Sequence, residues 1–350
     1  MMRGGIGALA LRAGRLVERG LERIGTRPDA APVLDPYLGY ATPDGLVIRA
    51  RVLSHLRRAE PDPRQSKWTN LKQMASLFVT DEVAGVPVSA RGRTATSDAE
   101  GYVTLTVPRE PGESGWVDVE ATIGGPTGGA TALCPVRVPA PGADHIVITD
   151  VDDTMIRTGA HSLARNLWTT FTGSALTREW HDDAPALMDA LAEGGRNPVF
   201  YVSSSPWNLH DFLETLLFAR AGLPRGPMFL RDLGLTEDGV GESHLGHKAA
   251  AIDTILAANP DLPCYLLGDT GQKDSAVYLE AARRHPGRVR GVALREPAEG
   301  VSGDDADEIR ALEGLDVPVW HGPSLAGAPD LWGIDEPLRR TGNAGARGAA

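Results

Sequence analysis

The stretch His145-Ile-Val-Ile-Thr-Asp-Val-Asp-Asp-Thr154 decides the fold of this chain and the place of its chemistry. Its apolar first half is typical of a strand that is buried on both faces of a parallel sheet. Asp150, Asp152 and Thr154 follow as an Asp-x-Asp-x-Thr motif. A carboxylate at such a strand end can attack a phosphoryl group, and a second one can act as general acid and base. For this motif alone, a solvated acidic turn remains an alternative.

A calcium-binding loop is excluded at this place. That loop needs Gly at its sixth position and Glu at its twelfth, where this chain has Met155 and His161. The sequence around the motif predicts strands that alternate with helices, which is typical of a mostly parallel α/β sheet covered on both faces. The expected strands are 145–149, 199–202, 228–230, 264–267 and 289–294. The expected helices are 161–172, 183–193, 207–220, 247–258 and 273–285.

Two further motifs have the chemistry of a phosphate site. Three serines precede the proline in the stretch Val199-Phe-Tyr-Val-Ser-Ser-Ser-Pro206. Ser203 and Ser204 are candidates to hold a phosphoryl oxygen with help from backbone N–H groups. A run of helix-capping serines is the alternative. Lys248 opens a predicted helix and can neutralise a phosphoryl group, although alone it would be interpreted as a surface lysine.

The last motif is Tyr265-Leu-Leu-Gly-Asp-Thr-Gly-Gln-Lys-Asp274, which again follows a strand. Asp269 and Asp274 lie five residues apart across a turn, and carboxylates of this kind suit Mg²⁺. No Cys or His pair with zinc spacing lies nearby. Because carboxyl ends of parallel strands share one edge of the sheet, the motifs should converge. The predicted metal ligands are Asp150, Asp152, Asp269 and Asp274.

In this order the four motifs resemble the haloacid dehalogenase superfamily over residues 145–296. The resemblance implies a Rossmann-like domain with small inserts. It assigns the nucleophile to Asp150 and acid/base catalysis to Asp152. It also assigns phosphoryl binding to Ser203 and Lys248, and a Mg²⁺ site to Asp269 with Asp274.

Longer segments are similar to the catalytic domain of the actin-patch type of phosphatidate phosphatase. The segments that carry this similarity are Thr149–Thr154, Tyr201–Asn208, Gly226–Asp232, His247-Lys248 and Gly268–Asp274. The resemblance implies a phospholipid substrate, phosphatidate, which would be converted to diacylglycerol. The inserts after Thr154 and after Pro206 are too short for a large cap domain, so we expect an open site. Leu163, Leu167, Trp168 and Phe171 could contact acyl chains or simply pack on the domain.

Residues 1–27 contain six Arg and two Glu, a net charge of +4 in a chain whose formal net charge is −11. Apolar and basic residues repeat at helical spacing over residues 4–24, which predicts an amphipathic helix. This helix could touch anionic lipid or dock on its own protein. A linker is expected at 26–36, and a helical insertion at 67–78 within a small antiparallel β-sandwich. The predicted parts are the helix at 1–27, the sandwich-like domain at 37–140, the phosphatase domain at 141–338 and a disordered tail at 339–350.

Composition narrows the function further. The chain of 350 residues is acidic and has two cysteines, Cys134 and Cys264, which argues against nucleic acid as a partner and against a disulfide framework. No transmembrane segment is expected, and we predict a cytoplasmic protein that is peripheral at the inner membrane surface. The alternatives are a phosphatase of soluble or protein phosphoesters and a non-catalytic membrane- or partner-binding module. The sequence does not indicate the oligomeric state.

Overall fold

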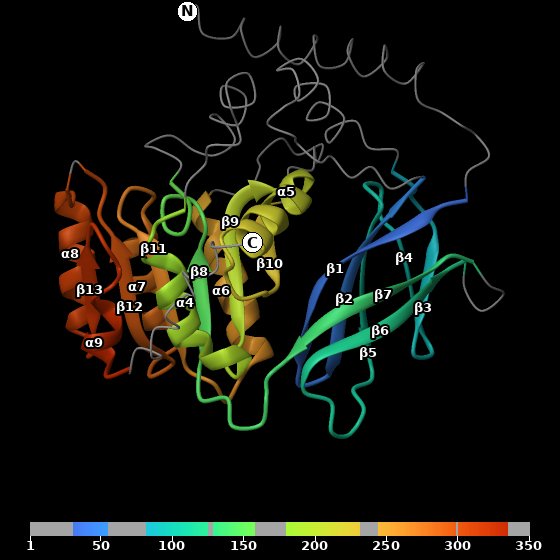
Figure 1. Cartoon of the computed structure of the whole chain (residues 1–350), viewed down its shortest axis with the longest axis horizontal. Coiled ribbons are helices and arrows are strands. Elements are labelled where there is room, and N and C mark those ends of the chain that lie inside the picture. Colours follow the sequence, from blue (N-terminus) through green and yellow to red (C-terminus); the bar gives the residue numbers. More distant parts are fainter. Residues whose placement is uncertain are drawn as a thin grey trace, which may run out of the picture. The chain divides into compact units, whose positions relative to one another are not determined.

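The computed structural model describes residues 31–54, 82–124, 129–157, 180–231, 244–298 and 300–334. These residues form two compact units, one that ends at Val138 and one that begins at Pro139. In Figure 1 the strands of the first unit run from blue to green, and those of the second unit run from green to red. The predicted helix at 1–27, the insertion at 67–78, the helix at 161–172 and the tail at 339–350 lie outside the described residues, as do the four candidate acyl-chain contacts.

The first unit is one mixed sheet of seven strands. Every neighbouring pair is antiparallel except β1 with β7, which is parallel. The strands lie in the order β4-β3-β6-β7-β1-β2-β5. Their bounds are β1 Val33–Thr42, β2 Gly45–Leu53, β3 Pro87–Ala90, β4 Arg93–Thr96, β5 Tyr102–Val107, β6 Gly115–Ile123 and β7 Thr131–Val138.

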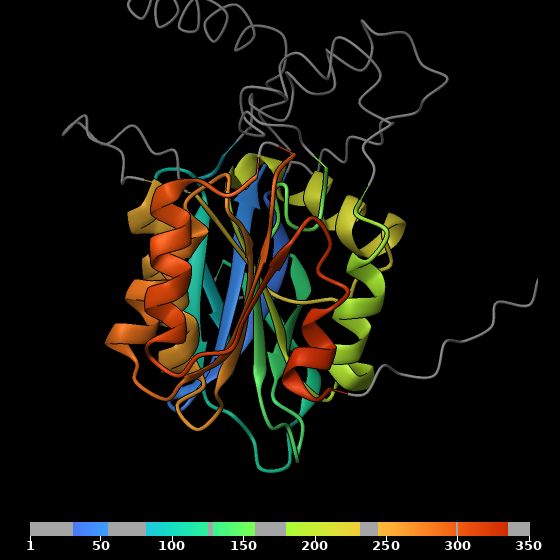
Figure 2. The same cartoon turned by 90° about the vertical axis from the view of Figure 1, so that its left-hand side faces the viewer.

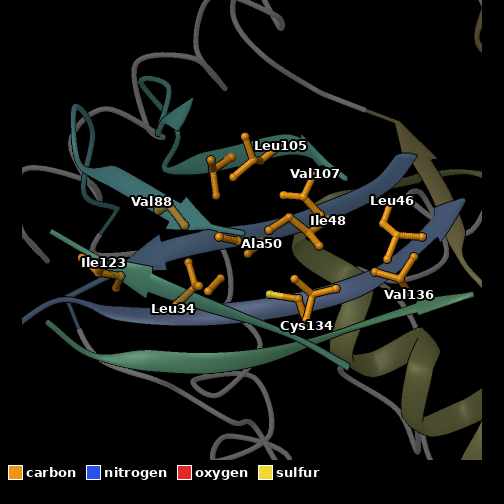
Figure 3. Packing of buried hydrophobic residues seen from close by; sticks show 14 of the residues in the cluster. Leu34, Leu46, Ile48, Ala50, Val88, Leu105, Val107, Ile123, Cys134 and Val136 are labelled. Atoms are coloured by element: carbon orange, nitrogen blue, oxygen red, sulfur yellow. The ribbon is translucent and has the colours of Figure 1, made fainter. Parts of the chain in front are cut away.

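Alternation along each strand builds the core of this unit. In β5, Val103, Leu105 and Val107 are buried while the threonines between them are exposed, as the period of two requires. Figure 3 labels Leu105 and Val107 among the apolar side chains of this core, together with Ile48 of the neighbouring β2 and Cys134 of β7. The end strands β4 and β5 also contact each other, so the single sheet curls over its own core. The prediction of a two-sheet sandwich is therefore not confirmed.

Two strands of this unit were not expected from the sequence. The predicted linker at 26–36 is wrong for residues 33–36, which belong to β1, and β7 had no predicted counterpart. Pro36 pairs with Ala50 on one side, whereas β7 pairs with β1 only at Gly39 and Tyr40. Proline is tolerated here because no second strand needs an N–H group at this position.

The second unit is a parallel sheet of six strands, in the order β10-β9-β8-β11-β12-β13. The strands are β8 Ile146–Asp150, β9 Val199–Pro206, β10 Met228–Arg231, β11 Cys264–Asp269, β12 Val289–Arg295 and β13 Val319–Gly322. All residues of β8 and β11 are buried, as expected for central strands of a sheet covered on both faces. The predicted α/β class is confirmed.

Helices cover both faces of this sheet. Figure 2 shows α4 and α9 on one face and α6, α7 and α8 on the other. Their bounds are α4 Ala184–Ala192, α5 His210–Glu214, α6 His244–Ala258, α7 Asp274–Arg284, α8 Gly303–Glu313 and α9 Ala328–Trp332. The predicted helix at 207–220 is divided into a 3₁₀ turn, α5 and a wider-turned segment. The sequence did not indicate β13, α8 or α9, which are short or lie beyond the motifs.

Candidate active site

The edge of the parallel sheet where β8 and β11 end contains the candidate site. Asp150 is the last residue of β8 and Asp269 is the last residue of β11, and these strands are neighbours. The chain leaves β8 toward β9 on one side and β11 toward β12 on the other, so the strand order reverses between them. Ligands of open α/β sheets bind at such a switch point, beyond the carboxyl ends of the strands.

A tight turn after β8 presents the first motif. Both Met155 and Ile156 donate backbone N–H groups to the carbonyl oxygen of Val151, at 3.0 and 3.1 Å. Asp153, inside this turn, has a φ of 59°, a left-handed conformation that is uncommon for a residue with a side chain. Thr154 Oγ1 donates to Asp150 Oδ2 at 3.1 Å, which fixes the orientation of the proposed nucleophile. The threonine of the motif thus acts on its first aspartate.

The motif after β11 places two more carboxylates beside Asp150. Asp269 Oδ2 accepts a hydrogen bond from the N–H group of Gly271 at 3.0 Å, and the N–H group of Asp269 donates to Asp274 Oδ2 at 3.2 Å. Asp274 begins α7 directly after Lys273, another left-handed residue with a φ of 66°. One ligand oxygen from each of Asp150, Asp269 and Asp274 lies within 4.8 Å of the others, and all three residues are buried.

Lys248 on α6 lies between two of these carboxylates. Its Nζ is 2.7 Å from Asp150 Oδ1 and 2.5 Å from Asp274 Oδ1, and the residue is only 3% exposed. Burial alone would lower the pKa of Lys248, but the two carboxylates outweigh this effect and raise the pKa above its usual value. The lysine is therefore a buried cation of the site, and the surface-lysine alternative is excluded.

The carboxylates themselves carry an excess of negative charge. Burial, only partly offset by Lys248, raises the pKa of Asp150 well above its usual value. Burial together with the charges of Asp274 and Asp150 raises the pKa of Asp269 to about 9. A group of buried like charges disfavours ionisation, and a divalent cation would remove that penalty.

These donors fit a hard divalent ion. They are carboxylate oxygens, which Mg²⁺ prefers. Asp269 Oδ1 is buried and has no hydrogen-bond partner among the described residues, so it remains available to a cation. The side chain of the fourth predicted ligand, Asp152, does not belong to the group of three. Its main-chain carbonyl accepts a hydrogen bond from Gln272 Nε2 at 3.2 Å.

The serines after β9 are brought to Asp152. Ser203 Oγ and Ser205 Oγ, which lie on the same side of the strand, donate to Asp152 Oδ2 at 3.0 and 3.4 Å. Ser204 lies on the other side, and its buried Oγ meets no hydrogen-bond partner in the described part of the chain. Ser203 and Ser204 therefore have different surroundings. The hydroxyl of Ser205, which was not among the predicted site residues, lies at the acid/base candidate Asp152.

Two more residues of this edge were missed. Gln272 lies within the quoted Gly-Asp motif, but nothing in the motif shows that its amide reaches the loop after β8. Arg295 ends β12 and is 4% exposed, and its Nε donates to the carbonyl of Thr154 at 3.1 Å. The one available signal was its place as a charged residue at the end of an apolar strand.

Comparison with known proteins points to the same part of the chain. Residues 145–296 match the family model described as "Phosphatidate phosphatase APP1, catalytic domain". The phosphatidate phosphatase APP1 of Saccharomyces cerevisiae is 27% identical over 150 residues, which are 43% of this chain and 25% of that protein. An uncharacterized protein of Schizosaccharomyces pombe is 22% identical over 263 residues, 73% of this chain and 43% of that protein. The chain thus spans less than half the length of either relative.

Among solved structures, a putative alpha-galactosidase/melibiase from Bacteroides fragilis aligns with 84% of this chain and 57% of its own, at 12% identity. The TM-score of 0.21 is too low to support any argument from that likeness. The match to this family model confirms the resemblance found in the sequence motifs, over residues 145–296.

Proposed function

We propose that this chain is a Mg²⁺-dependent phosphatase of the haloacid dehalogenase type that hydrolyses a phosphomonoester, and that its substrate is phosphatidate. The observation that carries the proposal is the buried group of Asp150, Asp269, Asp274 and Lys248 at the ends of β8 and β11. Such a group can hold a cation, and Asp150 can act on phosphorus. The matched family supports the choice of phosphatidate, whose hydrolysis gives diacylglycerol.

The chemistry assigns one role to each side chain. A carboxylate oxygen of Asp150 attacks phosphorus, and the bond to the ester oxygen breaks while Asp152 gives that oxygen a proton. Asp152 then takes a proton from water, whose oxygen attacks phosphorus and breaks the bond to Asp150. Lys248 offsets negative charge on the phosphoryl oxygens, and Ser204 can donate to one of them. Ser203 can do so after it exchanges its bond to Asp152.

Mg²⁺ would be held by the carboxylates of Asp150, Asp269 and Asp274 and by the backbone carbonyl of Asp152. It would stabilise the charge of the transferring phosphoryl group. The hydroxyls of Ser203 and Ser205 both donate to Asp152, and Ser205 can keep its bond when Ser203 turns to a phosphoryl oxygen. The two aspartates of the first motif are therefore held by different partners. Asp150 is oriented by Thr154 and Lys248, whereas Asp152 is oriented by serines.

The lipid substrate places the protein at a membrane surface. Among the described residues, none of the helices combines the length and the apolarity that crossing a bilayer requires. We propose a cytoplasmic protein that approaches the inner membrane surface through the basic segment at 1–27, where each basic residue contributes about 1 kcal/mol near anionic lipid. A phosphatase of soluble or protein phosphoesters would use the same side chains, and a non-catalytic binding module would not turn over either substrate.

Phosphate release decides among these functions. Purified protein is given phosphatidate in vesicles and, separately, a panel of soluble phosphoesters, each with Mg²⁺ or with EDTA. We expect Mg²⁺-dependent release from phosphatidate, which Asp150→Asn abolishes because an amide cannot attack phosphorus. Asp261→Asn, an exposed residue before β11, is the matched control and should retain full activity. Turnover of soluble esters alone would favour the second function, and no turnover at all would favour the third.

A further inference from the structure

Arg295 connects loops that meet at the edge of the parallel sheet. It lies beside Asp269 in the register of β12 with β11. Its guanidinium donates from Nε to the carbonyl of Thr154, from Nη2 to Asp183 Oδ1 at 2.8 Å and from Nη1 to Asp183 Oδ2 at 3.2 Å. Nη1 also donates to the carbonyl of Pro323 at 3.0 Å. A planar guanidinium can bind a carboxylate with two parallel bonds and still reach a third group, which an ammonium cannot do.

Asp183 completes the connection from the other side. This residue precedes α4, yet its side chain does not cap that helix. Instead, Asp183 Oδ2 accepts hydrogen bonds from Ser324 Oγ at 2.7 Å and from the N–H group of Leu325 at 2.6 Å. The carboxylate therefore ties Arg295 to the segment after β13. Asp183 forms a largely buried ion pair with Arg295 here instead of capping the helix, which indicates a role beyond the local structure.

The connection reaches the proposed nucleophile through one residue. Arg295 holds the main-chain carbonyl of Thr154, and the hydroxyl of Thr154 holds Asp150 Oδ2. The turn between Asp150 and Thr154 contains Asp153, which has a left-handed backbone conformation. A strained residue of this kind persists only where the surrounding structure over-determines it. Arg295 supplies such a constraint from outside the turn.

We propose that Arg295 and Asp183 form a positioning pair that holds the turn 150–156 in the geometry in which Asp150 meets the phosphoryl group. This inference rests on the proposed function, and it adds two residues that bind neither phosphate nor metal. Loss of the pair should lower kcat and leave KM unchanged, because it changes the orientation of the Asp150 carboxylate and not the binding of substrate.

Two variants and one control test the pair. Arg295→Lys keeps the charge but cannot make all the bonds, and Asp183→Asn removes the carboxylate. The control is Arg288→Lys, directly before the other end of β12. Arg288 Nη2 also donates to main-chain carbonyls, those of Asn259 and Leu262, at 2.6 and 2.8 Å. Urea unfolding shows that each protein is folded. We measure kcat and KM with a small chromogenic phosphoester. Mn²⁺ binding is measured by the loss of the electron paramagnetic resonance signal of the free ion.

We expect kcat to fall about ten- to a hundred-fold in Arg295→Lys and Asp183→Asn at constant KM. Mn²⁺ binding should weaken about ten-fold, because Asp150 is a ligand whose support has been removed. Arg288→Lys should lose stability but neither activity nor Mn²⁺ affinity. The proposal would be overturned if all three variants changed kcat and Mn²⁺ affinity equally. It would also be overturned if neither Arg295→Lys nor Asp183→Asn changed them. If Arg295→Lys does not fold, Asp183→Asn decides the outcome.

The failure of the two proposals can be told apart. If the wild-type protein hydrolyses no phosphoester, the proposed function falls, and Mn²⁺ binding alone then decides on the pair. Weaker binding in Arg295→Lys and Asp183→Asn than in Arg288→Lys would still support a pair that positions Asp150. Equal binding in all of them, or no binding by the wild-type protein, would refute it.

Discussion

Gly268→Ala is the substitution whose effect on the site follows most directly from distances. Gly268 precedes Asp269 in β11, and its backbone is not left-handed, so alanine is allowed there by conformation. A Cβ atom at this position would lie 2.6 Å from Asp274 Oδ2, 2.7 Å from Tyr278 Oη and 2.8 Å from Asp274 Cβ. Asp274 and Tyr278 are both buried. The absence of a side chain at Gly268 is what lets Asp274 approach the end of β11.

The size of the effect can be estimated from these contacts. Asp274 Oδ2 would have to retreat by at least about 0.4 Å to reach the shortest distance seen for real Cβ atoms, and such overpacking costs about 1–3 kcal/mol. The hydrogen bond from the N–H group of Asp269 to Asp274 Oδ2 is already 3.2 Å long, and it would be lost. A bond to a charged group contributes about 1.5–3 kcal/mol. Together the two effects give an expected destabilisation of about 2.5–6 kcal/mol.

Urea unfolding and a Mg²⁺ titration of activity measure the two consequences. Gly268→Ala should lower the free energy of unfolding by the amount above and should require more Mg²⁺ for half-maximal activity. The control is Gly303→Ala at the start of α8, where a Cβ atom would meet no atom within 4 Å. This variant should retain its stability and its Mg²⁺ requirement. The close approach of Asp274 does not matter to the site if the free energy of unfolding of Gly268→Ala is within about 0.5 kcal/mol of the wild-type value and its Mg²⁺ requirement is unchanged.

Three further predictions follow from the charges of the site. Lys248→Met should destabilise the Mg²⁺-free protein by about 3 kcal/mol, because Asp150 and Asp274 lose a buried cationic partner. Mg²⁺ should restore part of this stability. Equal urea-unfolding midpoints for Lys248→Met and the wild type without Mg²⁺ would contradict the prediction. Burial opposes ionisation of Asp183, but hydrogen bonds from Arg295 and Ser324 outweigh it and hold its pKa below the usual value. Its contribution to stability is therefore complete above about pH 5 and is lost as the pH falls through the folded pKa, so unfolding of Asp183→Asn should vary less with pH below about pH 5 than unfolding of the wild type. EDTA should abolish hydrolysis and added Mg²⁺ should restore it, whereas full activity in EDTA would exclude the metal site.

The sequence alone determined the α/β class, the five main strands of the second unit and the edge of the sheet at which the motifs gather. The physical reason is that these features are local or follow from topology. A buried parallel strand is a continuous apolar run, and residues at the carboxyl ends of parallel strands must share one edge of the sheet. Asp150 and Asp269 could therefore be placed in one site from the sequence, whereas Lys248 was assigned to it through the resemblance of the motifs.

Contacts between distant segments were decided only by the tertiary structure. The sequence did not show that Ser203 and Ser205 bind Asp152, that Gln272 reaches its carbonyl, or that Arg295 holds Thr154 from 141 residues away. The same holds for the first unit, in which alternation predicted strands but not their joining into one curled sheet. Periodicity states which face of a strand is apolar, but the choice of partner depends on packing over the whole chain, which no local pattern contains.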